Sequence, residues 1–356
     1  MKKGKSLSFA TIYLLLTILL IGSVLLAIRV GAVSIGFGDM RAYLWDVFGL
    51  AHKPIDTVTR GVFLQIRVPR ILLCAVVGAS LSVSGALMQA LFRNPIVEPG
   101  LVGTSSGAAL GAALVFVFGS QFHSLNNTTI ATVMLPVCAF AGGLCTTLIA
   151  YNLASVRGKI TVATMILIGV AVNALASGGT GFLSYIARDP QARSITFWSL
   201  GTFTGADWTS FFIVFGSAIV SILWALFYAK GLNALLLGES EAQALGVNTD
   251  RLKRRVIIVN TLMVAVATSM VGVIGFVGLV VPHVLRMVKS ADNRYLIIGC
   301  SLLGASMMIL ADVVARTIIA PAELPIGILT ALVGAPVFIT MLIRQAKSNT
   351  GGGFYA

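Results

Sequence analysis

Charged residues are scarce in this sequence. Only 10% of its 356 residues are charged, whereas 57% are hydrophobic, and the mean hydropathy is +0.97. This number of polar side chains is too small to cover the surface of a soluble globule. The composition therefore excludes a soluble enzyme and indicates an integral membrane protein. The apolar runs are continuous and about 20 residues long, without the alternation of a β-barrel. We therefore expect an all-α fold.

Groups that commonly carry catalysis or bind metals are few and scattered. The three histidines, His52, His123 and His283, lie far apart in the sequence, so a metal cluster is not expected. The four cysteines lie inside apolar runs and form no CxxC pair. We expect them to be small buried hydrophobic residues without a disulfide or metal. These cysteines are Cys74, Cys138, Cys145 and Cys300.

The sequence also lacks the GxxxxGK[ST] loop that cradles nucleotide phosphates. If this chain takes part in ATP-driven transport, a separate subunit must hydrolyse the nucleotide. An ion-coupled transporter would use acidic residues inside the apolar runs, and this sequence has very few of them. Asp312 is the only acid well inside a late run. Two roles are open for it: a proton relay, or a structural ion pair with Arg316, four residues later.

Long apolar runs dominate what is present. The first exceeds the roughly 7–15 residues of a signal-peptide core, so we expect a retained first span. Between the first two runs, helical spacing of apolar residues from Met40 to Phe48 predicts a short helix in the outer interface. The ten predicted spans are Leu7–Ile28, Ile71–Phe92, Gly100–Phe118, Thr128–Leu153, Thr161–Ile186, Phe211–Ala229, Val256–Val273, Phe276–Val288, Ile297–Val314 and Ile326–Ile343.

The formal charge of +13 follows the pattern of a membrane protein and not that of a nucleic-acid-binding protein. The basic residues fall in short loops between apolar runs instead of on one continuous face. With the N-terminus in the cytoplasm, 16 of the 25 basic residues lie on the cytoplasmic side, as the positive-inside rule requires. An even number of spans then places both termini in the cytoplasm.

Two interruptions divide this apolar pattern. In RNPIVEP, from Arg93 to Pro99, the two prolines force the backbone to turn. This elbow is either a constriction packed at membrane depth or a plain cytoplasmic turn. A second broken stretch, Gly272 to Pro282, is a possible counterpart in an internal repeat. Most of the 37 glycines are expected to serve helix packing at small-xxx-small spacing, as in Gly78, Ser82 and Ala86.

A polar island, LLGESEAQALGVNTDRLKRR, spans Leu236 to Arg255. Glu239 and Glu241 would occupy the first turn of a short helix, where they favour the helix dipole, and Gly246 would end it. A new helix is expected to begin at Asn248, Thr249 or Asp250. By itself, this pattern also fits a solvated surface helix.

Five motifs together resemble the permease family of ATP-binding-cassette importers for iron chelates and cobalamin, the FecCD family. They are RVPR followed by GASLSVSGALMQALFRNPIVEPGLVGTSSGAALG, then FWSLGTFTGADW, GESEAQALG, GFVGLVVPHVLR, and ADVVAR followed by AELPIGILTALVGAPVF. The resemblance implies a cobalamin-permease-like (type II importer) fold with about ten transmembrane helices. It also implies one permease domain over residues 1–356, with a cytoplasmic coupling-helix loop at 236–252.

The resemblance also assigns roles to particular residues. It implies contact with a partner ATPase by Glu239, Glu241, Ala242, Leu245 and Gly246. It implies docking of a substrate-binding protein by Arg67, Arg70 and Arg316, through guanidinium–carboxylate pairs. It implies a cytoplasmic gate at Asn94 and Ile96, opposed by Val162 and Ala163. On the outer side, Arg188 and Arg193 are candidate contacts for an anionic cargo.

The implied assembly has two copies of this chain, two ATPase subunits that bind ATP and magnesium, and a periplasmic or lipid-anchored binding protein in the bacterial inner membrane. No cofactor in the chain itself is implied. The expected cargo is haem or a ferric siderophore, with cobalamin as the alternative. An ion-coupled secondary transporter is a further alternative, which the shortage of intramembrane carboxylates disfavours.

Overall fold

The computed structural model describes residues 8–31, 57–119, 128–156, 159–160 and 162–348, together with residues 36, 38 and 45. The predicted interfacial helix from Met40 to Phe48 lies outside the described residues, apart from Trp45. His52 and His123 also lie outside them.

All ten predicted spans are helical, which confirms the all-α fold. Within the described ranges, seven helices are long and apolar enough to cross a membrane, and three shorter apolar helices accompany them. Their bounds are α1 Phe9–Arg29, α4 Val68–Leu91, α5 Thr104–Phe118, α6 Thr128–Ala154, α7 Val162–Ile186, α9 Trp208–Leu237, α11 Thr249–Val271, α12 Val277–Val288, α13 Asn293–Ala315 and α14 Ile326–Ser348.

The remaining described elements are short and connect the spans. Helix α3 (Thr57–Gly61) runs through the π-helix η1 (Val62–Arg67) into α4, and the 3₁₀ helix η2 (Pro99–Val102) precedes α5. Strands β1 and β2 form an antiparallel hairpin with Ser155 opposite Ile160. These connections also include α8 Asp189–Ser199, α10 Glu239–Ala244, β1 Ser155–Val156 and β2 Lys159–Ile160.

Polar side chains fix where several helices begin. Ser8, Asp207, Asn248 and Asp292 each accept a hydrogen bond from the backbone N–H three residues later, at 2.8–3.1 Å. Each therefore satisfies one of the N–H groups that a helix leaves unpaired at its start. The cap at Asn248 confirms the predicted start of a new helix after the polar island.

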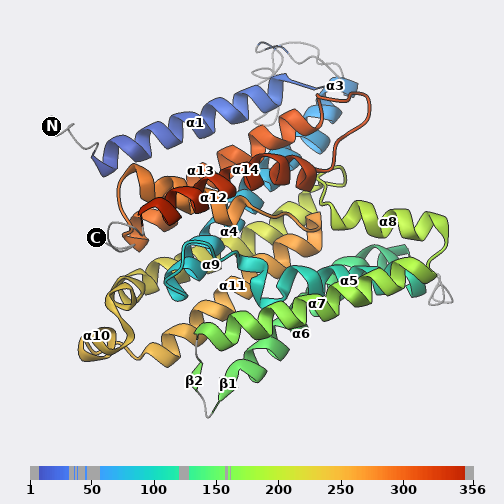
Figure 1. The fold of residues 1–356 in the computed structure, drawn as a ribbon. Coiled ribbons are helices and arrows are strands. Elements are labelled where there is room, and N and C mark those ends of the chain that lie inside the picture. Colours follow the sequence, from blue (N-terminus) through green and yellow to red (C-terminus); the bar gives the residue numbers. More distant parts are fainter. Residues whose placement is uncertain are drawn as a thin grey trace.

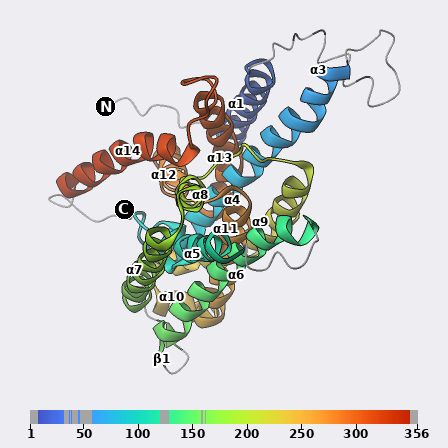
Figure 2. The same cartoon turned by 90° about the vertical axis from the view of Figure 1, so that its right-hand side faces the viewer.

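Helix α4 is the centre of the bundle, and Figure 2 shows α9, α11, α12 and α13 around it. Small residues allow this close approach. A Cβ atom on Gly85 would lie 1.8 Å from the carbonyl oxygen of Gly278 on α12, and one on Gly78 would lie 2.2 Å from that of Gly304 on α13. The contact at Gly78 confirms that a glycine of the predicted row serves helix packing.

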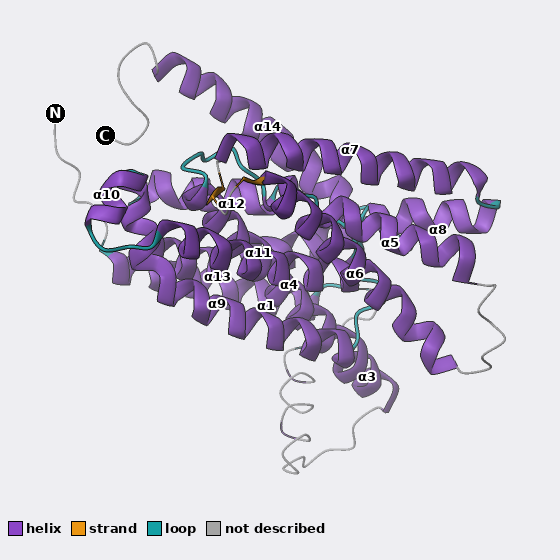
Figure 3. Ribbon diagram, turned by 90° about the horizontal axis from the view of Figure 1, so that it is seen from below, coloured by secondary structure: helices purple, strands orange, loops and turns teal. Residues whose placement is uncertain are grey.

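The bundle has two ends, which place the functional residues. Helix α10 lies at one end, and α3 and α8 lie at the other (Figures 1 and 3). Helix α1 begins on the same side of the bundle as α10 (Figure 1). The ring of Phe9 lies 5.3 Å from that of Tyr295, so α13 begins at this end too. We call this the α10 end and the opposite one the Arg70 end. The C-terminus of α14 and the β1–β2 hairpin also lie at the α10 end (Figure 1).

Several helices extend beyond the predicted spans. The helix that contains α4 starts at Thr57 and not at Ile71, and α9 continues past Lys230 to Leu237. The predictions stopped at charged residues, because hydropathy records only the apolar part of a helix. Charged side chains at the membrane surface remain compatible with helix geometry.

The prediction of four buried cysteines is wrong for one of them. Cys74 and Cys300 are buried and Cys138 is half-buried, but Cys145 is exposed on α6. All four are free thiols. The outer surface of a membrane helix is as apolar as its interior-facing side, so an apolar run does not distinguish a buried residue from one that faces lipid.

Candidate functional site

Helix α10 is a separate short helix, as predicted, and its sequence determines both of its ends. Gly238 precedes it with φ at +142°, where a Cβ atom would lie 1.8 Å from the Glu241 carboxylate. After it, Gly246 adopts a left-handed φ of +82°. The N–H of Gly246 donates to Gln243 and that of Val247 donates to Ala242, both at 2.9 Å. This is a Schellman cap, which glycine favours because it has no Cβ.

The five residues predicted to contact an ATPase lie on two sides of α10. Ala242 is fully buried, and the Glu239 carboxylate lies 2.7 Å from the buried ammonium group of Lys253 on α11. Glu241, Leu245 and Gly246 are exposed, and 65% of Leu245 is accessible. Ala242 and Glu239 hold α10 against the bundle, whereas the other three predicted residues form an exposed surface.

The predicted elbow is a turn packed inside the protein. Arg93 adopts a left-handed φ of +48°, and the Asn94 side chain accepts a hydrogen bond from the N–H of Ile96 at 3.1 Å. The Glu98 carboxylate then accepts a hydrogen bond from the N–H of Phe276, at 2.9 Å. Phe276 lies in the second interrupted stretch, so the two breaks in the helical pattern contact each other.

One residue that the sequence analysis did not single out completes this arrangement. Asn173, in the middle of α7, donates to the carbonyl oxygens of Gly100 and Leu101 at 3.2 and 3.1 Å. Irregular backbone at membrane depth needs such partners, because lipid offers none. A lone asparagine in an apolar run was the available signal.

A cavity of about 450 Å³ lies beside the elbow. Neutral hydroxyl and amide groups from three helices line much of it, and Glu98 contributes the only carboxylate of this lining. Apolar atoms nevertheless form most of the cavity surface. Its polar lining residues are Glu98, Ser105, Ser106, Asn173, Ser177, Thr180 and Ser199.

The predicted gate residues lie on the elbow and at the start of α7. Asn94 and Ile96 are half-buried in the elbow, and Ala163 is exposed in the first turn of α7. Val162 begins α7. The 3₁₀ helix η2, which follows the elbow, contacts α7 further along, where the backbone of Leu101 packs against Gly169.

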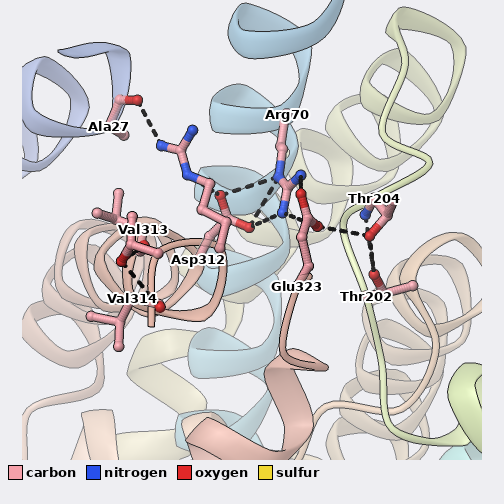
Figure 4. A network of polar contacts seen from close by, with 10 residues as sticks. Ala27, Arg70, Thr202, Thr204, Asp312, Val313, Val314 and Glu323 are labelled. Carbon is pink, nitrogen blue, oxygen red and sulfur yellow. Dashed lines mark hydrogen bonds and ion pairs between the residues drawn. The ribbon is translucent and has the colours of Figure 1, made fainter. Parts of the chain in front are cut away.

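The three arginines predicted to dock a binding protein lie close together at the Arg70 end, and Figure 4 shows Arg70 beside Asp312 and Glu323. Arg70 donates to Asp312 at 2.8 Å and to both carboxylate oxygens of Glu323, at 2.9 and 3.0 Å. Arg316 lies 3.5 Å from Asp312, which confirms the predicted structural pair. Arg67 is only 5% exposed and donates to the carbonyl oxygen of Ile28.

Glu323 is the most accessible charged member of the Arg70 pairs. Its side chain is 34% exposed, compared with 11% for Arg70 and 3% for Asp312. Thr204 also donates to Glu323, at 2.8 Å. The hydrogen bond from Arg70 lowers the pKa of Glu323 below its ordinary value. The cluster therefore joins α4 to α13 through Asp312, and α4 to two loops through the Glu323 carboxylate at the surface.

Arg188 and Arg193, the predicted cargo contacts, lie on α8, and both are exposed. Helix α8 is at the end opposite α10 (Figure 1). Neither arginine lines the cavity beside the elbow, which α8 reaches through Ser199.

These features define a polytopic membrane permease: apolar helices around a central span, two interruptions that meet beside a cavity, and an exposed helix at one end. The family model of the FecCD transport family matches residues 18–344. The chain belongs to the FecCD transport family.

Individual relatives agree with this assignment. The hemin transport system permease protein HmuU of Yersinia pestis is 39% identical over 338 residues, which are 95% of this chain and 96% of that protein. The vitamin B12 import system permease protein BtuC of Salmonella typhi is 40% identical over 283 residues, or 80% of this chain and 84% of that protein.

Solved structures share the fold. A metal-chelate type ABC transporter in an inward-facing conformation matches with a TM-score of 0.81 and 33% identity, over 94% of this chain and 99% of that chain. PsaBC from Streptococcus pneumoniae matches with a TM-score of 0.55 and 17% identity, over 79% of this chain and 93% of that chain. The second likeness shows the fold alone.

Proposed function

We propose that two copies of this chain form the membrane channel of an ATP-driven importer for an iron chelate in the bacterial inner membrane. The single observation that carries this proposal is α10. It is anchored to the bundle by Ala242 and by the Glu239–Lys253 pair, and it presents Glu241, Leu245 and Gly246 outward. A short helix held in this way can transmit a push from a separate subunit to α11.

The partner at α10 is an ATPase in this proposal. It binds the ATP and magnesium, since the chain has no phosphate-binding loop. The α10 end then faces the cytoplasm, together with both termini. The basic first turns of α11, including Arg251, Arg254 and Arg255, support this orientation.

The partner at the Arg70 end is a substrate-binding protein. Because the arginines are already paired, its carboxylates would have to exchange with one that is present. Glu323 is the candidate for exchange, since it is the more exposed of the two acids bound to Arg70. Asp312 and Arg316 would stay in place and hold the Arg70 guanidinium in position.

The path runs through the cavity beside the elbow, between two copies that meet along α7. Exposed apolar residues along α7, such as Leu167, Leu175 and Phe182, support this contact. The gate would close below the cavity, with Asn94 and Ile96 on one side and Val162 and Ala163 on the other. The hydroxyl-rich lining offers weak neutral contacts, which suit a path that must release its cargo.

The proposed cargo is haem or a ferric siderophore. The hemin permease aligns over 95% of this chain and the vitamin B12 permease over 80%, and this difference in coverage favours an iron chelate. Arg188 and Arg193, exposed on α8, would meet the carboxylates of an anionic chelate as it enters. Cobalamin is the alternative.

Uptake into proteoliposomes tests this proposal. Liposomes that contain the chain and its cognate ATPase, with the binding protein added outside and ATP inside, should accumulate haem or a ferric siderophore when no ion gradient is present. An ATPase that cannot hydrolyse ATP is the matched control and should abolish uptake. Accumulation of cobalamin but not of either iron chelate would overturn the proposal that the cargo is an iron chelate.

Ion coupling gives the opposite pattern in the same vesicles. Uptake without ATP that disappears when an ionophore collapses the proton gradient would contradict an ATP-driven importer. The structure favours ATP, because Asp312 is paired with Arg70 and Arg316 and is not a free carboxylate along a path.

A further inference from the structure

Helices α6 and α11 pack against each other and leave a groove of about 310 Å³ between them. Apolar side chains form most of its walls, and three of them are strongly exposed: Leu144 (36%), Leu148 (49%) and Ile258 (49%). The polar end of the groove is formed by Tyr151, Asn152 and Arg254. The groove is therefore open, apolar along its length and basic at one end.

The groove has the depth of one membrane leaflet. Both helices are membrane spans by length and hydropathy. From Phe140 to Asn152 the groove follows thirteen residues of α6, or about 18 Å of helix, compared with roughly 15 Å for half of a bilayer's hydrocarbon. Its polar end lies at the α10 end, since Asn152 precedes the β1–β2 hairpin and Arg254 is in the second turn of α11.

Arg254 differs from its two basic neighbours in α11. Lys253 is bound to Glu239 at 2.7 Å, and the Arg255 guanidinium lies over the ring of Tyr228, 5.6 Å from its centre. Among the described residues, Arg254 forms no ion pair, not even with Asp250 one turn earlier, and its side chain is exposed. A positive charge is thus available at the mouth of an apolar groove.

We propose that this groove is a binding site for an anionic phospholipid. One acyl chain lies along Leu144, Leu148 and Ile258, and the headgroup phosphate binds Arg254, with Tyr151 and Asn152 as further donors. Basic pockets between membrane helices at the cytoplasmic surface recognise anionic headgroups in this way. Neither the cargo nor the ATPase enters this argument, so the site stands independently of the transport function.

Native mass spectrometry of the purified chain tests this proposal. The chain is exposed to equal amounts of phosphatidylglycerol and phosphatidylcholine, and bound lipids are counted. The Arg254→Gln variant should lower the ratio of bound phosphatidylglycerol to phosphatidylcholine about fivefold, the contribution of one arginine near the membrane surface. Arg251→Gln is the matched control, because Arg251 is also exposed at the start of α11 but does not line the groove. It should leave the ratio unchanged.

A second variant tests the acyl-chain part of the site. Leu148→Trp fills the groove and should reduce the binding of both lipids, while an unchanged melting temperature shows that the chain is folded. If Arg251→Gln and Arg254→Gln lower the ratio equally, the attraction is diffuse and the proposal is overturned. An unchanged ratio in Arg254→Gln also overturns it.

The other possible occupant is protein. In a background in which Cys145 is replaced by serine, Ile258→Cys is treated with a thiol cross-linker in membranes. A lipid site predicts that this cysteine reacts with lipid-soluble maleimide and forms no cross-link to a second copy. A cross-linked dimer through residue 258 would show that another copy of the chain covers the groove and would overturn the proposal.

Discussion

The ammonium group of Lys253 lies 2.7 Å from the carboxylate of Glu239, although the two are fourteen residues apart in the chain. The Lys253 side chain is only 4% exposed, whereas Glu239 is 37% exposed. This ion pair joins α10 to α11, and α11 packs on the central helix α4. A displacement of α10 therefore reaches the centre of the bundle through α11.

Loss of this pair should loosen α10. Glu239→Gln leaves a buried ammonium group without its carboxylate, at a cost of about 1–2 kcal/mol for a charged hydrogen bond at a half-exposed site. We expect the amides of residues 239–246 to exchange with deuterium about tenfold faster, as measured by mass spectrometry. Glu241→Gln is the control, since that carboxylate is exposed. Equal protection in the two variants would mean that the pair does not hold α10.

Close packing of α4 against α12 should make Gly85 intolerant of a side chain. The Cβ atom of Gly85→Ala would lie 1.8 Å from the carbonyl oxygen of Gly278, so the helices must separate, at a cost of roughly 1–3 kcal/mol. Thermal unfolding in detergent should show a lower melting temperature. Gly216→Ala on α9 is the matched control, because nothing lies within 4 Å of its added Cβ. That variant should be neutral or slightly stabilising.

The cluster at the Arg70 end should weaken in acid. The hydrogen bond from Arg70 lowers the pKa of Glu323 in the folded protein. The stability that this pair contributes is therefore present above the unfolded pKa, near the ordinary 4.5, and is lost as the pH falls through the lower folded value. Melting temperatures measured between pH 6 and pH 3 should fall more steeply for the wild type than for Glu323→Gln. Parallel curves would show that the pair contributes nothing.

The same carboxylate should compete with a docking partner. If a binding protein inserts its own carboxylate at Arg70, Glu323→Gln removes the internal competitor and should tighten docking several-fold. Arg70→Gln should weaken it. Surface plasmon resonance on the reconstituted permease measures both, with Asp189→Asn on α8 as a control for charge at the same end. Weaker docking in Glu323→Gln would show that Glu323 supports the interface instead of competing for it.

Much of the fold was predictable because local physics determines it. Continuous apolar runs indicated the ten spans. The acids of its first turn and Gly246 indicated α10, and the capping residues from Asn248 indicated the start of α11. These features depend on residues close together in the chain. For the same reason, the Asp312–Arg316 pair was predictable, since one helical turn separates the two.

The contacts that shape the site were not predictable from the sequence. Arg70 is 242 residues from Asp312 and 253 from Glu323, and only the packing of α4 beside α13 brings them together. The sequence also placed Arg67 and Arg70 before a helix that was predicted to start at Ile71, whereas the continuous helix starts at Thr57. Asn173 was missed because its partners, Gly100 and Leu101, lie on another element.

The central claim is that a separate ATPase binds the exposed side of α10, and site-specific cross-linking tests it most directly. Leu245→Cys, in a background in which Cys145 is replaced by serine, is treated with a short thiol cross-linker in membranes that contain the cognate ATPase. We predict a cross-linked product that contains this chain and the ATPase, and no such product for cysteine at buried Ala242. A Leu245→Cys chain that never cross-links to the ATPase, but is labelled by a membrane-impermeant thiol reagent added outside intact cells, would contradict the account.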